Sequence, residues 1–294
     1  MIVCFGSINL DLIFPLPALP LPGQTVLGKA MRIEPGGKGA NQAVAAARDG
    51  GQVLFAGAVG QDSLADQALA LMREAGVDLS RVKRCDTSTG CASICVDPQG
   101  GNHIAVASGA NLLAVQAQVE QGLLGPATTL LLQAETDLAE TATLIRRAKA
   151  AGARIVLNLA PAAALAEDAL RAVDVLVVNE DEGRWLGESL GSAGDAASLH
   201  ATLGVPVVRT LGGDGLEVAA PCGAWSMPVH KVTVVDTTAA GDCFTGVLAA
   251  GLDRGLDLKT AIARANVAAG LCCSRAGSQG SLPRRLETDA ALGV

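Results

Sequence analysis

Short runs of consecutive hydrophobic residues alternate along the chain with longer amphipathic segments. The runs are typical of strands that are covered on both faces in a parallel sheet, and they lie at residues 2–6, 53–60, 129–134, 154–160, 174–179 and 205–212. The segments between them have Ala, Leu and Val at helical spacing and often end in Gly; they lie at 39–50, 63–76, 137–152, 196–204, 239–255 and 258–274. This alternation predicts an α/β fold of three layers over residues 1–294, with helices on both faces of a mostly parallel sheet.

Two segments break this alternation. Residues 12–34 are proline-rich and then strand-like, and residues 89–108 have the pattern of a hairpin around the turn at 98–101. We expect these segments to form a small antiparallel sheet beside the main one. The first segment follows the first predicted strand at the edge where open α/β sheets bind ligands, so this small sheet is expected to be a lid.

Composition and charge narrow the class of partner. The 294 residues carry a formal net charge of −7, which disfavours binding to nucleic acid. Every long apolar stretch contains a polar residue or Pro, and the N-terminal residues lack the pattern of a signal peptide, so we expect a cytoplasmic protein without a membrane partner. The 8 cysteines form no C-x-x-C pair and lie mostly in apolar stretches, which favours reduced thiols that act as small hydrophobic side chains.

The common nucleotide-loop fingerprints are absent. Residues 23–30 have the glycine and lysine spacing of a phosphate-binding loop, but the segment ends in Ala30, where such a loop needs Ser or Thr for Mg²⁺. This segment also follows prolines rather than a buried strand, so we reject it as a nucleotide site. The spacing G-x-G-x-x-G does not occur, which removes the usual argument for a dinucleotide.

The most informative segment is the entry to the helix predicted at 239–255. Ala239, Ala240 and Gly241 leave backbone N–H groups uncovered at a helix N-terminus, and such groups suit a phosphoryl group. Asp242 follows in the first turn, where the helix dipole stabilises a carboxylate that could accept a proton from a hydroxyl. An Asp there can simply cap a helix, but the small residues before it favour chemistry.

Two further polar clusters support a hydroxyl-bearing ligand. Gly37 allows close approach of the backbone to a ligand, and Lys38 and Asn41 supply donors at the entry to another helix. Asn9 and Asp11 lie two residues apart, so they share one face of an extended segment. Each cluster alone fits an ordinary loop or a solvated strand end. Together they indicate a polyhydroxylated ligand that is held and deprotonated at one hydroxyl.

The chain resembles the ribokinase-like (pfkB) family of sugar kinases. The resemblance extends almost from end to end, through GSINLD, PGQTV, GGKGANQAVAAAR, TGCASICVD, ASGAN, LLLQAET, LNLAPA, VVNEDE, RTLGGDG, VDTTAAGDCFTG and RAGSQGSLP. It implies a central sheet flanked by helices and a β lid that often forms the contact of a homodimer. It also implies ATP-dependent phosphorylation of a primary hydroxyl, with D-ribose as the expected sugar and D-ribose 5-phosphate as the product.

The resemblance also implies a role for each matching position. Asp242 corresponds to the base, with the amides of Ala239, Ala240 and Gly241 as the anion hole. The sugar-binding positions are Asn9, Asp11, Gly37, Lys38, Asn41 and Glu135, together with Asp242. The nucleotide-binding positions are Asn179, Thr210, Gly212, Gly215 and Asn266, and Glu182 would organise Mg²⁺ through water. The positions of a loop for an activating monovalent cation, K⁺, are Asp236, Thr238, Cys272, Arg275, Gly277 and Ser281, several of them through carbonyl oxygens.

Other functions stay open at this point. The substrate could be deoxyribose, a ketohexose derivative or a nucleoside, although a chain with no Tyr, 4 Phe and 2 Trp has few side chains to stack on a base. A sugar sensor without catalysis could share the fold, but a sensor has no need of the base at Asp242. His103, His200 and His230 match no catalytic position, and we expect them in surface or lid packing.

Overall fold

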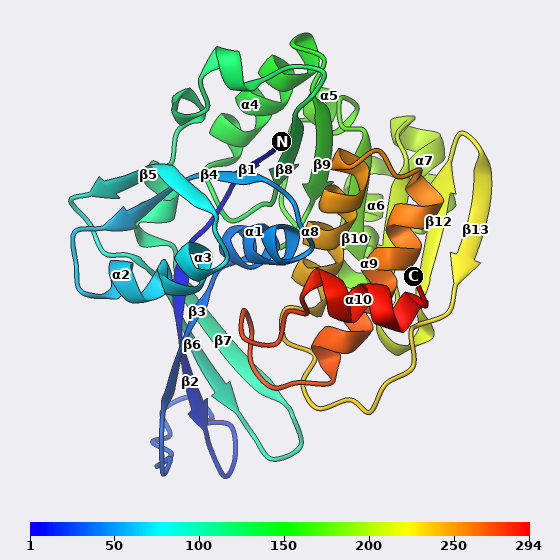
Figure 1. Ribbon diagram of the computed structural model, residues 1–294. Coiled ribbons are helices and arrows are strands. Elements are labelled where there is room, and N and C mark those ends of the chain that lie inside the picture. Colours follow the sequence, from blue (N-terminus) through cyan, green and yellow to red (C-terminus); the bar gives the residue numbers. More distant parts are fainter.

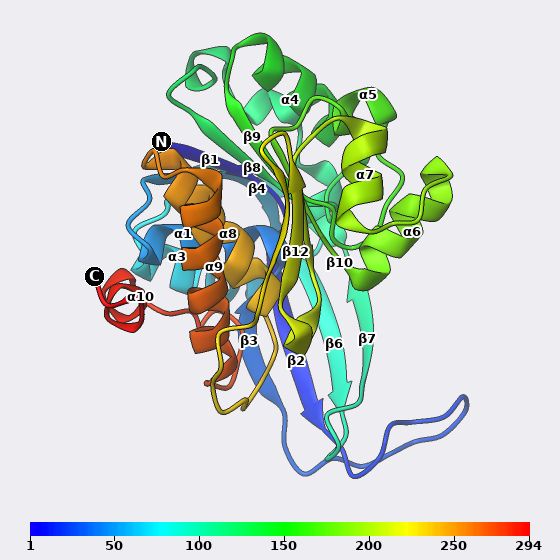
Figure 2. The same ribbon diagram turned by 90° about the vertical axis from the view of Figure 1, so that its right-hand side faces the viewer.

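The computed structural model describes residues 1–294 as a nine-stranded sheet between two layers of helices, with a separate four-stranded sheet projecting from one end (Figures 1 and 2). The strands of the large sheet are, in spatial order, β13 (Gly223–Met227), β12 (Leu216–Ala220), β11 (Val207–Thr210), β10 (Val175–Asn179), β9 (Arg154–Asn158), β8 (Thr129–Leu132), β1 (Ile2–Phe5), β4 (Val53–Gly60) and β5 (Asp78–Cys85). The predicted three-layer α/β fold is confirmed.

The strand pairs from β5 to β11 are all parallel, whereas β12 and β13 are antiparallel. The predicted strands are β1, β4, β8, β9, β10 and β11, and most of their residues are buried. The hydrophobic pattern did not predict β5, because this edge strand has polar and partly exposed residues along its length. It also missed β12 and the exposed outer strand β13.

Helices cover both faces of the large sheet (Figure 2). One side carries α1 (Lys38–Arg48), α2 (Leu64–Ala68), α3 (Ala70–Glu74), α8 (Ala240–Asp253), α9 (Leu258–Cys273) and α10 (Arg285–Leu292), and the other carries α4 (Leu138–Ala150), α5 (Glu167–Leu170), α6 (Glu180–Leu190) and α7 (Ala196–Leu203). Short 3₁₀ turns occur at η1 (Gly109–Leu113), η2 (Gln116–Gln118), η3 (Gln121–Leu123) and η4 (Gly212–Asp214). The helix predicted at 63–76 is interrupted at Leu69, and α5, α6 and α10 were not predicted. Each helical layer buries its own hydrophobic cluster against the sheet.

The small sheet has the strand order β3 (Arg32–Gly36), β2 (Asn9–Pro15), β6 (Gly90–Val96) and β7 (Asn102–Ala107). The hairpin predicted around the turn at 98–101 is confirmed as β6 and β7, and β2 pairs antiparallel with β3. The prediction of an entirely antiparallel sheet is wrong, because β2 and β6 are parallel. These two strands follow β1 and β5 of the parallel sheet, so both leave its edge in the same direction (Figure 1).

No helix of the structure is both long enough and apolar enough to cross a membrane. All eight cysteines are free thiols, and Cys4, Cys243 and Cys272 are buried.

Candidate active site

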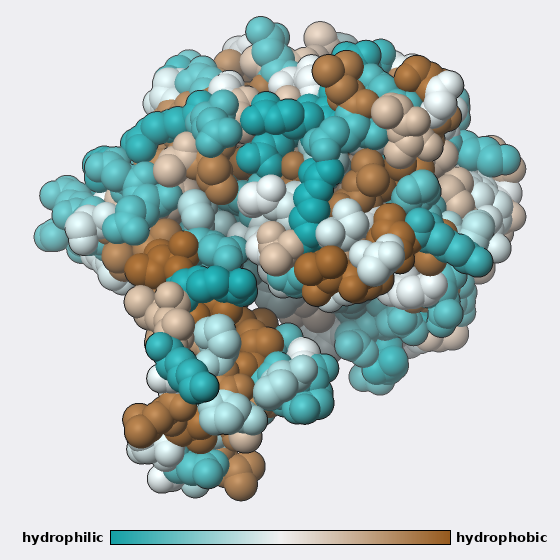
Figure 3. Space-filling model, turned by 60° about the horizontal axis from the view of Figure 1, so that its bottom comes forward, coloured by the Kyte–Doolittle hydropathy of each residue, from teal (hydrophilic) through white to brown (hydrophobic).

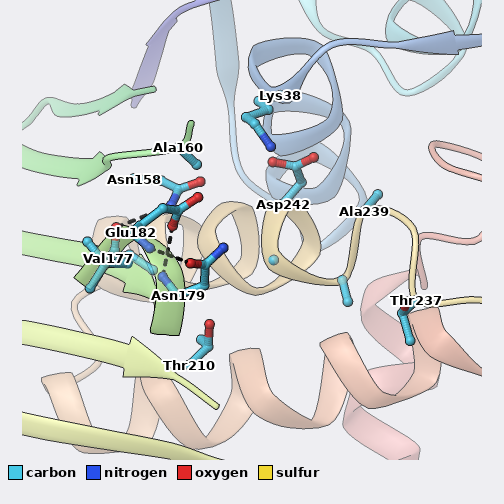
Figure 4. Close-up of a pocket in the computed structure, with 13 residues that line it drawn as sticks. Lys38, Asn158, Ala160, Val177, Asn179, Glu182, Thr210, Thr237, Ala239 and Asp242 are labelled. Atoms are coloured by element: carbon cyan, nitrogen blue, oxygen red, sulfur yellow. Dashed lines mark hydrogen bonds between the residues drawn. The ribbon is translucent and has the colours of Figure 1, made fainter. Parts of the chain in front are cut away.

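A cavity of about 190 Å³ lies where the carboxyl ends of three parallel strands meet the N-terminus of α8 (Figure 4). Asn158 ends β9, Asn179 ends β10 and Thr210 ends β11, and all three line the cavity. Asp242 and Lys38 line its opposite side. This is the edge at which open α/β sheets bind ligands, because side chains from successive strand ends converge there.

A second cavity, of about 660 Å³, adjoins the first and shares Asn179, Thr210 and Gly241 with it. The positions expected to bind nucleotide all line this larger cavity; they are Asn179, Thr210, Gly212, Gly215 and Asn266. Its volume lies within the range of small-molecule sites. His230 is half-buried and lines the same cavity.

The backbone before α8 leaves donors free at the junction of the two cavities. Ala239 has φ 59° and is the one non-glycine residue with positive φ, a conformation that costs an L-residue about 1 kcal/mol. The N–H of Ala240 donates to the carbonyl oxygen of Thr237 at 3.2 Å. The N–H groups of Ala239, Gly241 and Asp242 have no acceptor within the protein. Two of the three expected amides are therefore free, and the amide of Asp242 adds a third.

Asp242 is buried, and helix α1 supplies a donor to each of its carboxylate oxygens. Asn41 Nδ2 donates to Asp242 Oδ2 at 2.9 Å, and Gln42 Nε2 donates to Asp242 Oδ1 at 2.9 Å. Figure 4 shows Lys38, also on α1, extending toward Asp242. The two glycine-rich helix entries, far apart in the sequence, thus face each other across one carboxylate.

The remaining expected sugar-binding residues gather beside this carboxylate. Glu135 Oε2 accepts hydrogen bonds from Ser7 Oγ at 2.6 Å and from the N–H of Lys38 at 3.1 Å. Asn9 Oδ1 accepts from Asn111 Nδ2 at 2.8 Å, which anchors the first residue of β2. These bonds join the chain segments before β2, after β8 and at the start of α1.

Gly37 is required where these segments cross. Its φ is 89°, and a Cβ at this position would lie 2.7 Å from the backbone nitrogen of Asn9. Asp11 lies in β2 opposite Glu34 of β3, and its carboxyl group packs against Gly36. A side chain at either glycine would displace a residue expected to bind sugar.

The site has more carboxylates than cations. Burial, reinforced by the nearby charges of Glu135, Glu34 and Asp242, raises the pKa of Asp11 to about 7. Burial also raises the pKa of Glu182. Burial alone would lower the pKa of Lys38, but the surrounding carboxylates outweigh it and raise that pKa. One ammonium group therefore faces several carboxyl groups, an imbalance that a bound cation would relieve.

Asn179 and Glu182 close the N-terminus of α6 with reciprocal bonds. Glu182 Oε2 accepts from the N–H of Asn179 at 2.8 Å, and Asn179 Oδ1 accepts from the N–H of Glu182 at 2.8 Å. Both residues also line the smaller cavity. The second carboxylate oxygen of Glu182 is not used by the cap, and carboxylate oxygens are the ligands that Mg²⁺ prefers, directly or through water. The residues present therefore fit a magnesium ion.

The two segments expected to hold a monovalent cation are joined by one carboxylate. Asp236 Oδ1 accepts from the N–H of Thr238 at 2.9 Å, and Asp236 Oδ2 accepts from the N–H of Gly277 at 3.0 Å. Cys272 Sγ lies 3.1 Å from Ser281 Oγ. Cys272 Sγ also lies 3.7 Å from the carbonyl oxygen of Thr238, so these segments contribute a carboxylate, a hydroxyl and a carbonyl, which are the kinds of oxygen that hard cations bind. The side chain of Arg275 pairs with Glu287, which leaves only its backbone for such a site.

Several residues that shape the site were not found from the sequence. Ser7 and Asn111 anchor Glu135 and Asn9, and Gln42 and Asn158 lie against Asp242 or the cavity beside it. Asn158 is the last polar residue of the strand predicted at 154–160 and ends the observed strand β9, so the rule that directed attention to strand ends could have found it. Gln42 directly follows Asn41, and helical spacing alone gives no reason for both to reach one carboxylate.

The comparisons with known proteins agree with this geometry. The model of the pfkB family carbohydrate kinases matches residues 1–285. The ribokinase of Haemophilus influenzae is 35% identical over 291 residues, which cover 96% of this chain and 95% of that protein. The crystal structure of a ribokinase from Thermotoga maritima has a TM-score of 0.91 at 31% identity and covers 100% of this chain and 99% of the other. A ribokinase of Arabidopsis thaliana complexed with ribose and ATP has a TM-score of 0.88 at 27% identity, with 100% and 98% covered.

Proposed function

This chain belongs to the pfkB family of carbohydrate kinases, and on that premise we propose that it transfers the γ-phosphoryl group of ATP to the primary hydroxyl of D-ribose, giving D-ribose 5-phosphate. Residues 1–294 would act as one kinase domain, with segments 12–34 and 89–108 as its lid. The observation that carries the proposal is the position of Asp242. Its carboxylate lies between the cluster of sugar-binding candidates and the cavity lined by the nucleotide-binding candidates.

The sugar would be held by Asn9, Asp11, Lys38, Asn41 and Glu135. Asn41 supports this assignment in particular, because its Oδ1 is buried without a hydrogen-bond partner and is suited to accept from a hydroxyl of the ligand. Asp242 would accept the proton of the primary hydroxyl as the hydroxyl oxygen attacks the γ-phosphorus and the bond to the β-phosphate oxygen breaks.

The free N–H groups of Ala239, Gly241 and Asp242 would stabilise the negative charge of the phosphoryl group in transfer. The larger cavity would hold the adenosine part, with Asn266 and Gly215 among its walls. Mg²⁺ at Glu182 would neutralise phosphate charge. A monovalent cation between residues 236–238 and 272–281 would stabilise the loop that leads into the anion hole.

We also propose a homodimer formed through the lid. Large apolar side chains are exposed on it, including Ile33, Ile104 and Val106, and Figure 3 shows hydrophobic surface on this projecting part. Strand register places Ile104 and Val106 on the same face as Asp11. A second copy packed there would cover this apolar surface beside the sugar site.

The test of substrate is a panel of sugars with ATP and Mg²⁺, read by coupled release of ADP. We expect kcat/KM for D-ribose to exceed that for deoxyribose, fructose and adenosine. A higher value for any of these would replace ribose as the assigned substrate while leaving the kinase assignment standing.

A further inference from the structure

Gln42 is a fully buried amide whose polar atoms are all engaged at the centre of the site. Its Nε2 donates to Asp242 Oδ1 at 2.9 Å and to Asn158 Oδ1 at 3.0 Å. Its Oε1 accepts from Gln133 Nε2 at 2.8 Å. No water or ligand is needed to satisfy this side chain, because each polar atom has a protein partner.

These contacts fix the orientation of the amide. Asn158 Nδ2 donates to the carbonyl oxygen of Val177 at 3.2 Å, so Asn158 presents its oxygen to Gln42. If the amide of Gln42 were flipped, its oxygen would face the oxygens of Asn158 and Asp242, and its nitrogen would face the donor of Gln133. A rigid chain of hydrogen bonds therefore runs from the backbone of β10 to the carboxylate of Asp242.

We infer that Gln42 is a positioning residue that occupies Asp242 Oδ1 permanently and thereby makes Oδ2 the oxygen that accepts the proton. The partner of Oδ2 is Asn41, which differs from Gln42 because its own Oδ1 has no partner. Asn41 can exchange its bond for one to a sugar hydroxyl, whereas Gln42 is held on every side. The inference rests on the proposed function and adds to it which carboxylate oxygen reacts and what fixes that choice.

The variant that tests this inference is Gln42→Glu, which keeps the size of the side chain but replaces the donor by a second carboxyl group. Two carboxyl groups at this distance share a proton, so Asp242 would be available as a base only at higher pH. The other titratable groups around Asp242 are unchanged in this variant; they are Lys38, Asp11, Glu182, Cys4 and Cys272.

We expect kcat of Gln42→Glu at neutral pH to fall by about 10- to 100-fold, and the rising limb of its pH profile to move at least about one pH unit toward alkaline pH. The Kd for ribose, measured by calorimetry, should change by less than about threefold, since Oδ2 and the sugar-binding residues are intact. An unshifted pH profile would overturn the inference.

Gln118→Leu is the matched control. Gln118 is also a buried glutamine, and its Nε2 donates to the carbonyl oxygens of Gly57 and Arg81, away from Asp242. A second variant, Gln42→Leu, removes the amide of Gln42. We expect Gln118→Leu and Gln42→Leu both to lower the melting temperature, but only Gln42→Leu to lower kcat. Equal losses of kcat in these two leucine variants would mean that Gln42 acts only through stability and would overturn the inference. This comparison also tests the inference if Gln42→Glu fails to fold.

Asp242→Asn distinguishes failure of the inference from failure of the proposed function. If this variant keeps wild-type turnover, the assignment of Asp242 as base is wrong, and the inference falls with it. If Asp242→Asn is inactive but Gln42→Glu has a normal pH profile, the proposed function stands and only the role of Gln42 is wrong.

Discussion

Asn179 and Glu182 close the N-terminus of α6 with reciprocal hydrogen bonds, and both also line the cavity beside Asp242. The cap uses one oxygen of Glu182 and fixes the direction of the other. A role as a helix cap therefore does not exclude the proposed role in ligand binding, since the cap leaves both side chains at the wall of the cavity. Asn41 combines the two roles in a similar way, with one polar atom bonded to Asp242 and the other without a partner.

The base at Asp242 is tested by Asp242→Asn, which keeps the shape of the side chain but cannot accept the proton. We expect kcat to fall by about 10²- to 10⁴-fold, the usual range for loss of a general base. The Kd for ribose from calorimetry should be nearly unchanged, because the amide can still bond to Asn41 or to a hydroxyl. A variant that keeps more than about a tenth of wild-type turnover would contradict the assignment.

The raised pKa of Asp11 predicts how stability depends on pH in the ligand-free protein. Its pKa is about 7 in the folded state, against an ordinary value of 3.8, so the folded state holds this proton more tightly than the unfolded chain does. This contribution is fully present below about pH 4 and is lost as the pH rises through about 7, and it amounts to roughly 2–4 kcal/mol. The free energy of unfolding should therefore fall over this range.

Urea denaturation between pH 4 and 8 measures this effect, with Asp11→Asn as the comparison. The variant has no proton to lose at residue 11, so its stability should fall less as the pH rises. Parallel curves for the two proteins would show that Asp11 titrates normally.

At the scale of elements, the site is formed by the N-termini of α1 and α8, which face each other at the carboxyl edge of the sheet. The buried strands and these two helices could be predicted from the sequence, because their hydrophobic patterns are local. The edge strands β5 and β13 could not: β5 has polar residues along its length, and β13 is a short segment of largely exposed residues with no run of buried hydrophobic positions. The contact of Gln42 with Asp242 was also out of reach, since it depends on how two helices distant in sequence pack together.

The exposed apolar face of the proposed lid leads to a prediction that the protein is a dimer. Ile104→Glu places a charge on the exposed apolar face that carries Asp11, so we expect monomers with a raised KM for ribose, while the wild type should have about twice the mass of one chain. Light scattering measures the mass. Leu286→Glu, at a position 81% exposed on α10, is the control and should remain dimeric. A wild-type monomer with normal affinity for ribose would contradict the proposed dimer.

The loops joined by Asp236 predict activation by K⁺. A cation there would stabilise the segment that leads into Ala239. The kcat measured with K⁺ should therefore be about fivefold higher than the kcat measured with an equal concentration of a bulky organic cation. K⁺ should also raise the melting temperature, since it binds the folded state. Asp236→Ala should abolish both effects, and equal rates and melting temperatures in the wild type would remove the cation site.

At the scale of the whole molecule, folding brings together side chains that are far apart in the chain. Asn41 and Asp242 are separated by 201 positions and bond at 2.9 Å, and Ser7 and Glu135 are separated by 128 positions and bond at 2.6 Å. The sheet positions these groups by presenting its strand ends and two helix N-termini at one edge. The small sheet β3-β2-β6-β7, the proposed lid, projects from this same end of the molecule (Figure 2).

The most direct test of the proposed reaction is ³¹P NMR of the wild-type protein with ATP, Mg²⁺ and D-ribose. We predict that the signal of the γ-phosphate disappears as that of a phosphomonoester coupled to the two C5 protons of ribose appears, in step with ADP. A phosphate on another carbon of ribose would contradict the assigned orientation of the sugar. Release of inorganic phosphate alone, or no consumption of ATP, would contradict the account of the site as a ribose kinase.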